Sequence, residues 1–343
     1  MNKHLAIDAG KHSTKVCIYD PAKEHPSYFK FRTKIGKGDF DDDMLEKDTV
    51  VVQIDNGPVY KVGQGGKTEP SLETSKKTDI HRICTLAGIA LAIGKESGNQ
   101  VIDVSIGMAL SQIGIPQERL SYKDFILGEE GTMHTVKIKS SAAAAVVTVN
   151  FTCGKRMVYP EGTGPAFELA ERCEGVVGII DIGSLNSNHI YMDNLEAIDE
   201  SSFSTELGGR VIVDGLAQAL SSELGARVDE NLVSNLLRRD YSERFLSPKN
   251  GDKEIEEKSR KVIDSFLLDH VRAIKARCDT KHWPLNFMEL IFVGGTATLL
   301  KREIEEVFGE NVFIPENAEF INAKGFLRRM CAADGIDIGT WAD

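Results

Sequence analysis

Two aspartates occupy the same kind of position at distant points in the chain. Asp8 ends an apolar run in LAIDAGKHSTK (5–15), and Asp181 ends another in IIDIGSLNSN (179–188). Each is followed two residues later by a glycine, Gly10 or Gly183, and then by polar residues. Glycine after a strand lets the backbone approach a ligand, and successive amide groups in such a turn form a cavity for an anion. The two segments therefore predict a pair of anion-binding turns.

Side chains in both turns could add to a polyphosphate site. The residues expected around the phosphates are Gly10, Lys11, His12, Ser13 and Lys15 in the first turn and Gly183, Ser184, Leu185 and Asn186 in the second. Lys15 would place a point charge on a β- or γ-phosphate. Two carboxylates beside a polyanion need a cation, so Mg²⁺ near Asp8 and Asp181 is the natural complement. The alternative is that each Asp-x-Gly is an ordinary hairpin turn, since both residue types favour turns.

A third glycine site lies in VGGTATL (293–299), where an apolar strand meets Gly294 and Gly295 and a helix follows. Such a junction suits a flat base or ribose packed on bare backbone. The chain has no GxxxxGK[ST] motif and no GxGxxG after its first strand. These absences argue against a P-loop or a Rossmann dinucleotide site.

The elements that must position these residues follow from periodicity. Residues 4–8 and 15–20 predict one hairpin, and 175–181 with the NHIYMDN that follows predict another. Further strands are expected at 101–110, 133–149 and 289–293, and helices at 81–98, 208–225, 253–278 and in the tail. Residues 160–173 are expected to begin as a turn and to continue as a helix. Each Asp-x-Gly segment thus lies at a strand–turn–strand junction early in its half of the chain. We interpret this as a cryptic internal repeat.

Composition narrows the class of protein. The 343 residues are enough for two domains, and the net charge of −11 argues against an autonomous nucleic-acid-binding surface. Contact with DNA through an adaptor protein stays open. The six cysteines form no CxxC pair, which argues against zinc and a disulfide framework. The N-terminus has no long apolar run, so we expect no signal peptide, no membrane contact and a cytoplasmic location.

The order DAG (8–10), DIG (181–183) and VGG (293–295) resembles the phosphate 1, phosphate 2 and adenosine motifs of the actin, sugar-kinase and heat-shock-chaperone ATPase superfamily. Within it the chain is most similar to the ParM-like bacterial actin-like ATPases. Three stretches support this: YPEGTGPAFEL (159–169), SSFSTELGGRVIVDGL (201–216) and FIPENAEFINAKGFL (313–327). The likeness covers nearly the whole chain as an ordered set of short motifs.

The resemblance implies an α/β fold in which two ribonuclease-H-like, actin-like domains flank a nucleotide cleft. Domain I would span 1–160, with the C-terminal helix (318–343) returning to it, and domain II would span 161–317. The cofactors would be ATP, with GTP as the alternative, and Mg²⁺. The protein would assemble head to tail into a filament, hydrolyse nucleotide and segregate plasmid DNA through a DNA-binding adaptor, without binding nucleic acid directly.

The same resemblance assigns roles to residues. Asp8 and Asp181 would lie near Mg²⁺, holding it mostly through water, and Glu161 would help to position the attacking water. The nucleoside would meet Gly294, Gly295 and Thr296, with Glu206, Gly208 and Arg210 near the base or ribose. The alternative for Glu161 is a glutamate favoured at a helix N-terminus by the macrodipole.

The chain departs from the family in its second phosphate motif. Threonines and a later aspartate commonly follow the glycine there, whereas this chain has Ser184, Leu185 and Asn186, with Asn188 near the position of that aspartate. We expect Ser184 to adopt a conformation easy for glycine. The change bears on magnesium geometry and hydrolysis rate more than on nucleotide binding.

Two other functions stay open. A nucleotide-binding scaffold with weak hydrolysis is compatible with the SLNSN loop (184–188). A small-molecule kinase of the same superfamily would need a catalytic base in a sugar pocket, in a motif that the chain does not show. For filament contacts, 36–48 and 240–254 are candidates only because they lie outside the predicted site, and both also read as ordinary solvated loops.

Overall fold

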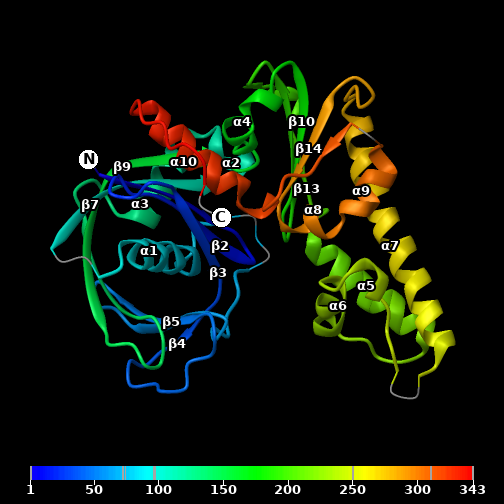
Figure 1. Cartoon of the computed structure of the whole chain (residues 1–343), viewed down its shortest axis with the longest axis horizontal. Coiled ribbons are helices and arrows are strands. Elements are labelled where there is room, and N and C mark those ends of the chain that lie inside the picture. Colours follow the sequence, from blue (N-terminus) through cyan, green and yellow to red (C-terminus); the bar gives the residue numbers. More distant parts are fainter. Residues whose placement is uncertain are drawn as a thin grey trace. The chain divides into compact units, whose positions relative to one another are not determined.

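The computed structural model describes residues 2–71, 73, 75–95, 98–248, 251–309 and 311–341. The chain divides into two compact units: unit 1 comprises Met1–Ala170 and Phe320–Asp343, and unit 2 comprises Glu171–Glu319. Both are mixed α/β, in agreement with the predicted fold class (Figure 1). The first boundary follows Ala170 rather than residue 160. Glu161 therefore belongs to unit 1 and not, as the sequence suggested, to the second domain.

Within the described residues, unit 1 contains a nine-stranded sheet in the order β3-β2-β1-β7-β9-β8-β5-β6-β4. Its strands are β1 (Lys3–Ala9), β2 (Ser13–Tyr19), β3 (Ser27–Arg32), β4 (Ile35–Lys37), β5 (Thr49–Ile54), β6 (Val59–Gly63), β7 (Asn99–Met108), β8 (Met133–Lys139) and β9 (Val147–Pro160). Strands β1 and β2 form the predicted first hairpin, and β1 also pairs in parallel with β7. The first Asp-x-Gly segment thus lies where this hairpin turns.

The β1 strand is buried on both faces because a helix covers each. Leu5 and Ile7 join the core built around α1 (Asp79–Ile93), whereas Ala6 joins the core built around α10 (Ile321–Ala333). Figure 1 shows α1 and α10 on opposite sides of this sheet. The two-residue alternation of a strand explains why neighbouring residues enter different cores. The C-terminal helix packs on β1, β2 and β7.

Other helices of unit 1 are α2 (Leu110–Ile113), α3 (Pro116–Leu127) and α4 (Pro165–Glu168), and the 3-10 turn η1 (Ala170–Arg172) runs across the unit boundary. The turn predicted at the start of 160–173 is confirmed, but the helix predicted after it is reduced to the short α4 and η1. The amides of Gly162 and Gly164 donate to the Asn322 side chain, at 3.1 and 3.3 Å. A Cβ on Gly164 would lie 2.3 Å from Asn322 Cα. Packing on α10 fixes this segment as a loop.

Unit 2 repeats the hairpin arrangement. Within the described residues its sheet has the order β12-β11-β10-β14-β15, with β13 paired to β11. The strands are β10 (Val176–Ile182), β11 (Ser187–Asp193), β12 (Glu196–Ala197), β13 (Phe203–Thr205), β14 (Glu289–Val293) and β15 (Val312–Phe313). Strands β10 and β11 form the second predicted hairpin, and β10 pairs in parallel with β14.

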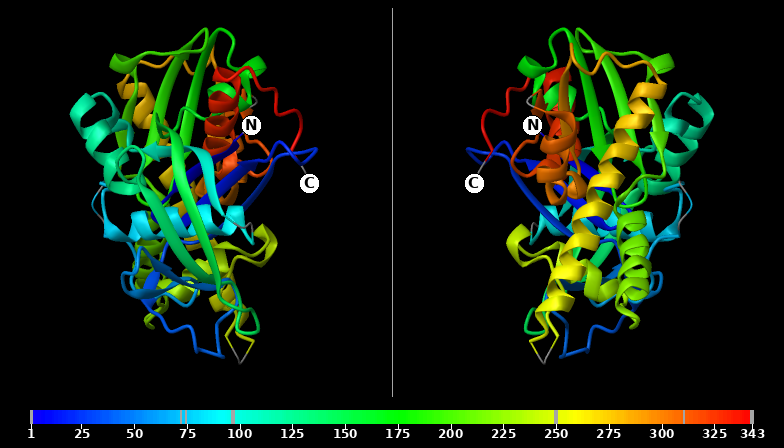
Figure 2. Two further views of the ribbon diagram at one scale, coloured as in Figure 1. Left: turned by 90° about the vertical axis from the view of Figure 1, so that its left-hand side faces the viewer. Right: turned by 90° about the vertical axis from the view of Figure 1, so that its right-hand side faces the viewer.

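The helices of unit 2 are α5 (Gly209–Leu224), α6 (Glu230–Leu237), α7 (Lys253–Thr280), α8 (Gly295–Leu299) and α9 (Lys301–Phe308). The 3-10 turns are η2 (Asp199–Ser201), η3 (Tyr241–Glu243) and η4 (Ala318–Phe320). The last of these, η4, runs across the unit boundary. The predicted helices at 208–225 and 253–278 are confirmed as α5 and α7. The long α7, yellow in Figure 2, packs against α5 and α9.

Several smaller expectations can be compared with the structure. Residues 140–146 are neither helix nor strand, and the strand resumes at Val147. Residues 39–48 are turns and loop. Residues 96 and 97 of the helix predicted at 81–98, 249 and 250 of the segment 240–254, and 342 and 343 of the tail lie outside the described residues. Nowhere in the described chain does a helix combine the length and apolarity that a membrane span requires.

Candidate functional site

The turn between β1 and β2 is tightly closed. The Gly10 amide donates to Asp8 O at 3.0 Å and to Ser13 O at 3.1 Å. A Cβ on Gly10 would lie 3.0 Å from Ser13 O and 3.2 Å from Lys15 Nζ, so this position favours glycine by space. Lys11 donates to Ser75 O at 2.9 Å, which ties the turn to the segment before α1.

Four buried or half-buried charges meet beside this turn. Asp8, only 5% exposed, accepts from Lys15 Nζ at 3.0 Å through Oδ2 and from Lys76 Nζ at 3.3 Å through Oδ1. Lys76 is also 5% exposed, and its ammonium makes a second ion pair with Glu161 Oε1. The result is a chain of alternating charge that runs from Lys15 through Asp8 and Lys76 to Glu161.

These pairs decide the protonation of the buried groups. Burial raises the pKa of Asp8, but Lys15 and Lys76 outweigh it and hold the pKa well below its usual range. Burial lowers the pKa of Lys76, but Glu161 and Asp8 outweigh it and hold the pKa above its usual range. Both groups are therefore charged at neutral pH. Burial, followed by repulsion from Lys76, lowers the pKa of Lys11 to about 8.

The backbone places Glu161 next to Asp8. Glu161 follows the last residue of β9, and its amide donates to Met108 O at 2.9 Å at the end of β7. A Cβ on Gly107 would lie 3.6 Å from both Asp8 Oδ1 and Glu161 Cγ. The two carboxylate side chains therefore flank a residue that has no side chain of its own.

Sequence reasoning missed Lys76 and His81. Lys76 lies 68 residues from Asp8 in a polar segment, and no spacing connects it to either phosphate motif. His81, fully buried in α1, hydrogen-bonds through Nδ1 to Thr78 Oγ1 at 2.7 Å. Burial, followed by repulsion from Lys76 and Lys11, lowers the pKa of His81 to about 3. These residues come close to the first turn only when the 75–81 segment folds over β1, so no local sequence signal identifies them.

The turn between β10 and β11 is held by a series of backbone hydrogen bonds. The Gly183 amide donates to Asn186 O at 2.9 Å. The carbonyls of Gly183 and Ser184 accept from the first amides of α5, those of Gly209 and Arg210, at 3.0 and 2.7 Å. Thr296 Oγ1 also donates to Gly183 O at 2.9 Å. The turn is thereby packed onto the start of α5 and α8.

Gly294 and Gly208 of unit 2 lie so close to neighbouring backbone that a side chain would not fit. Gly294 has a φ of +91°, and a Cβ there would lie 2.4 Å from Ile182 O and 2.6 Å from Asp181 Oδ1. A Cβ on Gly208 would lie 2.3 Å from the carbonyl carbon of Leu185. The VGG corner and the turn that follows Asp181 thus interlock, and Asp181 itself is 8% exposed.

The prediction that Ser184 adopts a conformation easy for glycine is wrong. Among the described residues, the positive-φ positions include neither Ser184 nor Gly183. The turn therefore accepts serine without the left-handed conformation that glycine favours. Asn188, opposite Asp181 in the hairpin, accepts from Ser204 Oγ at 2.7 Å. Here an amide stands at the position where the family commonly has a carboxylate.

Two of the residues predicted near the base or ribose are Glu206 and Arg210. Glu206 is exposed. Arg210 makes ion pairs with Asp214 at 2.9 Å and with Glu230 at 3.1 Å. A groove of about 660 Å³ between α5 and α6 is lined by Asp214, Ala217, Gln218, Ser221, Arg227, Val228, Asp229, Glu230 and Asn231. Arg210 thus lies at its edge, held by two of the residues that line it.

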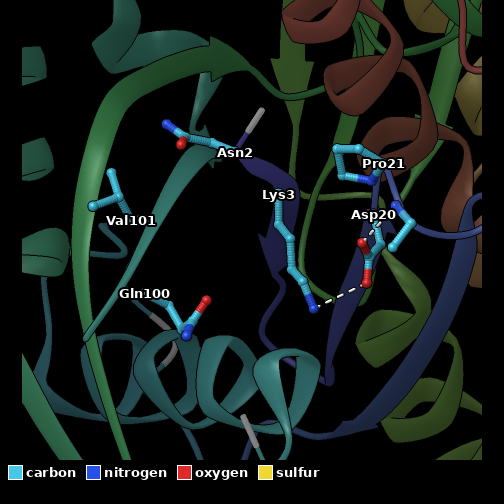
Figure 3. Close-up of a pocket in the computed structure, with 7 residues that line it drawn as sticks. Asn2, Lys3, Asp20, Pro21, Gln100 and Val101 are labelled. Carbon is cyan, nitrogen blue, oxygen red and sulfur yellow. Dashed lines mark hydrogen bonds and ion pairs between the residues drawn. The ribbon is translucent and has the colours of Figure 1, made fainter. Parts of the chain in front are cut away.

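Two other features of unit 1 lie at the opposite end of β1 from Asp8. A cavity of about 320 Å³ is lined by Asn2, Lys3, Asp20, Pro21, Ala22, Gln100 and Val101, and Figure 3 shows Lys3 reaching across to Asp20. His4 Nε2 lies 3.0 Å from Asp334 Oδ2 and 3.6 Å from Asp103 Oδ2. Lys155 also pairs with Asp334.

The donor chemistry of the two turns fits a magnesium–phosphate complex. Mg²⁺ in proteins usually keeps several waters and takes one or two carboxylates together with substrate phosphates. Each unit offers one such carboxylate beside its turn, Asp8 or Asp181. Both oxygens of Asp8 already accept from lysine ammonium groups, so contact with the metal through water suits it better than direct ligation.

The fold of the chain is similar to that of known proteins. Residues 6–164 match the family model of the N-terminal domain of actin-like proteins. The fold matches Ta0583, an archaeal actin homolog, with a TM-score of 0.72 and 18% identity over 96% of this chain and 99% of that one. The chain as a whole thus has the fold of the actin-like proteins. No curated sequence matches it significantly.

Two further solved structures share this fold. The pSK41 ParM protein aligns with a TM-score of 0.69 and 14% identity, covering 97% of this chain and 98% of that chain. Alp12, solved as a filament, aligns with a TM-score of 0.69 and 22% identity, covering 97% and 99%. The actin-like fold thus extends over almost the whole chain.

Proposed function

We propose that this actin-like protein binds ATP with Mg²⁺, hydrolyses it, and assembles head to tail into filaments. GTP is the alternative nucleotide. Plasmid segregation through a DNA-binding adaptor is the process that we propose these filaments serve.

The observation that carries the proposal is the repeated corner. In each unit an antiparallel hairpin is joined to a parallel strand, β7 or β14, and a buried aspartate stands at the end of the first hairpin strand. Asp8 and Asp181 are thus equivalent residues of two phosphate-type turns. An ordinary hairpin turn would not require the same carboxylate at the same register twice.

The relatives lend support. Ta0583 has been solved in complex with ADP, and Alp12 as a filament. Head-to-tail contacts are heterologous, and such contacts give open filaments when the rotation does not close.

Phosphoryl transfer needs positioning and charge stabilisation more than a strong base. Mg²⁺, when bound, would neutralise charge on the transferred phosphoryl group. In this chain, amides of the 9–13 and 183–186 turns would bind phosphate oxygens, Lys15 would offer a positive charge, and the Glu161 carboxylate would orient water. The VGG corner of unit 2 would pack against the nucleoside.

The test combines right-angle light scattering with phosphate release in the same samples. Purified protein is titrated with Mg²⁺ plus ATP, GTP or ADP, and without nucleotide. We expect scattering to rise with ATP above a threshold protein concentration and to decay as phosphate appears. Steady hydrolysis with flat scattering would refute the filament and favour a kinase-like enzyme, and filaments without phosphate release would favour the scaffold.

A matched pair of variants assigns the site. Asp181→Asn should weaken binding of a fluorescent Mg²⁺–ATP analogue about tenfold or more, because it removes a carboxylate beside the metal. Asp193→Asn, an exposed aspartate at the far end of the same hairpin, is the control and should bind like the wild type. Equal binding by both variants would remove Asp181 from the site.

A further inference from the structure

Lys76 is the group beside the first phosphate turn to which neither a motif nor the family resemblance assigned a role. Its ammonium lies 3.3 Å from Asp8 Oδ1 and pairs with Glu161 Oε1. At 5% exposure, it is almost entirely removed from water. A lysine loses both hydration and side-chain entropy when it is buried, so such a position needs compensation. Here the compensation is two carboxylates.

The surroundings hold Lys76 in a defined place. Lys76 belongs to the segment just before α1, where Lys76 O accepts from the Thr78 amide at 2.9 Å. The neighbouring Ser75 O accepts from Lys11 of the first turn at 2.9 Å. The segment 75–78 is therefore tied both to the turn and to Glu161.

Glu161 depends on this lysine for its orientation. Its backbone is fixed by the hydrogen bond to Met108 O, but its side chain has three rotatable bonds beyond Cα. Across the described residues, Lys76 makes the only ion pair recorded for Glu161. A carboxylate that must place a water molecule loses about 100-fold in rate when it is displaced by roughly 1 Å.

We propose that Lys76 is a positioning residue for nucleotide hydrolysis, holding the Glu161 carboxylate beside Asp8 in the orientation that places the attacking water. This inference rests on the proposed function. Lys76 acts through Glu161, and its positive charge also lets two buried carboxylates stand close to each other next to a polyphosphate.

The primary test is a double-mutant cycle measured by phosphate release at saturating Mg²⁺–ATP. Lys76→Met should lower kcat about 100-fold, while the dissociation constant of a fluorescent ATP analogue changes by less than about threefold. Glu161→Gln should lower kcat by a similar factor. The variant with both changes should be no slower than Glu161→Gln alone, within about threefold, because one residue acts through the other.

Two further variants complete the test. Lys77→Met removes the same charge from the adjacent residue, which is exposed and donates to Ser121 Oγ, and it should behave like the wild type. Lys76→Arg keeps the charge and should recover at least about tenfold of the rate lost in Lys76→Met. Far-UV circular dichroism and urea midpoints establish that each variant is folded. If Lys76→Met does not fold, Lys76→Arg and the double variant, which has one buried carboxylate fewer, still give the comparison.

The outcomes separate this inference from the function on which it rests. A wild-type chain that releases no phosphate refutes the proposed ATPase and the role of Lys76 together. Normal wild-type turnover with an unchanged kcat in Lys76→Met refutes the role of Lys76 alone. Losses that multiply to about 10⁴-fold in the double variant, or a Lys76→Met defect confined to binding, would also overturn it, because Lys76 would then act on the nucleotide directly.

Discussion

The Asp-x-Gly corners of the two units share one backbone arrangement but are stabilised in different ways. In unit 1, lysine and carboxylate side chains hold the corner: Asp8 is bracketed by Lys15 and Lys76, and Lys76 continues to Glu161. In unit 2, hydrogen bonds and close approach of backbone hold the corner: the turn after Asp181 bonds to the start of α5, and Gly294 contacts it without a side chain.

The difference shows what each corner can tolerate. A charged cluster at a buried site is sensitive to pH and to loss of one partner, because an uncompensated buried charge is costly. A glycine-packed corner has no room for a methyl group. The two corners therefore repeat one backbone arrangement but are stabilised by different interactions.

The two units can be followed separately because each contains one of the two tryptophans. Trp341 of unit 1 donates to Glu168 Oε1, and Trp283 of unit 2 donates to Ser201 O. Variants carrying Trp283→Phe or Trp341→Phe therefore report by fluorescence on unit 1 or unit 2 alone. These backgrounds serve for the urea-unfolding measurements below.

The largest effect is expected at Gly294. Gly294→Ala should destabilise unit 2 by about 4 kcal/mol, which combines left-handed strain with overlap against Ile182 O and Asp181 Oδ1. Gly309 is the matched control, with a φ of +83° and no atom within 4 Å of the place that a Cβ would occupy. Gly309→Ala should cost only about 1 kcal/mol. Equal costs would mean that strain, not close packing, protects the unit 2 corner.

The next effect is expected at Asp8. Asp8→Asn should destabilise unit 1 by about 3 kcal/mol at pH 7, because Lys15 and Lys76 lose a buried partner. The pKa of Asp8 in the folded protein lies below its unfolded value of about 3.9, so its stabilisation is present above that pH and is lost as the pH falls further. The difference between wild type and variant should thus narrow between pH 4.5 and pH 3.5, as urea midpoints at these values would measure. A difference that widens in acid would contradict the charged cluster.

A smaller effect is expected at Thr296. Thr296→Val removes the hydroxyl that donates to Gly183 O and should cost unit 2 about 1 kcal/mol. Thr298→Val, an exposed threonine on the same short helix, is the control and should be close to neutral. If the two variants are equally stable, the hydroxyl contributes nothing to the turn.

The smallest effect is expected at Lys11, whose pKa is lowered to about 8 by burial and by Lys76. Between pH 8 and the unfolded value of about 10.4, the unfolded chain binds more protons, so the stability of unit 1 should rise with pH. Solvent screening keeps the gain below about 1 kcal/mol. Lys11→Met should abolish the rise, whereas Lys77→Met should keep it, as urea midpoints at pH 7.5 and 9.5 would reveal.

Much of the fold could be predicted because its signals are local. The hairpins at Asp8 and Asp181 and the helices α5 and α7 follow from the alternation or helical spacing of apolar residues over their own lengths. The helix predicted in the second part of 160–173 is shorter than expected, and contacts with Asn322, more than 150 residues away, fix the turn before it. The local sequence pattern does not indicate a contact with so distant a residue.

For the candidate site, the sequence by itself determined which turns carry aspartate, glycine and polar residues, because these residue types express local backbone and hydrogen-bonding preferences. The tertiary structure alone decided that Lys76 stands between Asp8 and Glu161, that Glu161 belongs to unit 1, and that Gly294 is pressed against Ile182. The physical reason is that burial and charge pairing depend on which distant segments are brought together. A residue's type limits the chemistry that it can perform, but its neighbours in the fold set its charge, its orientation and the space around it.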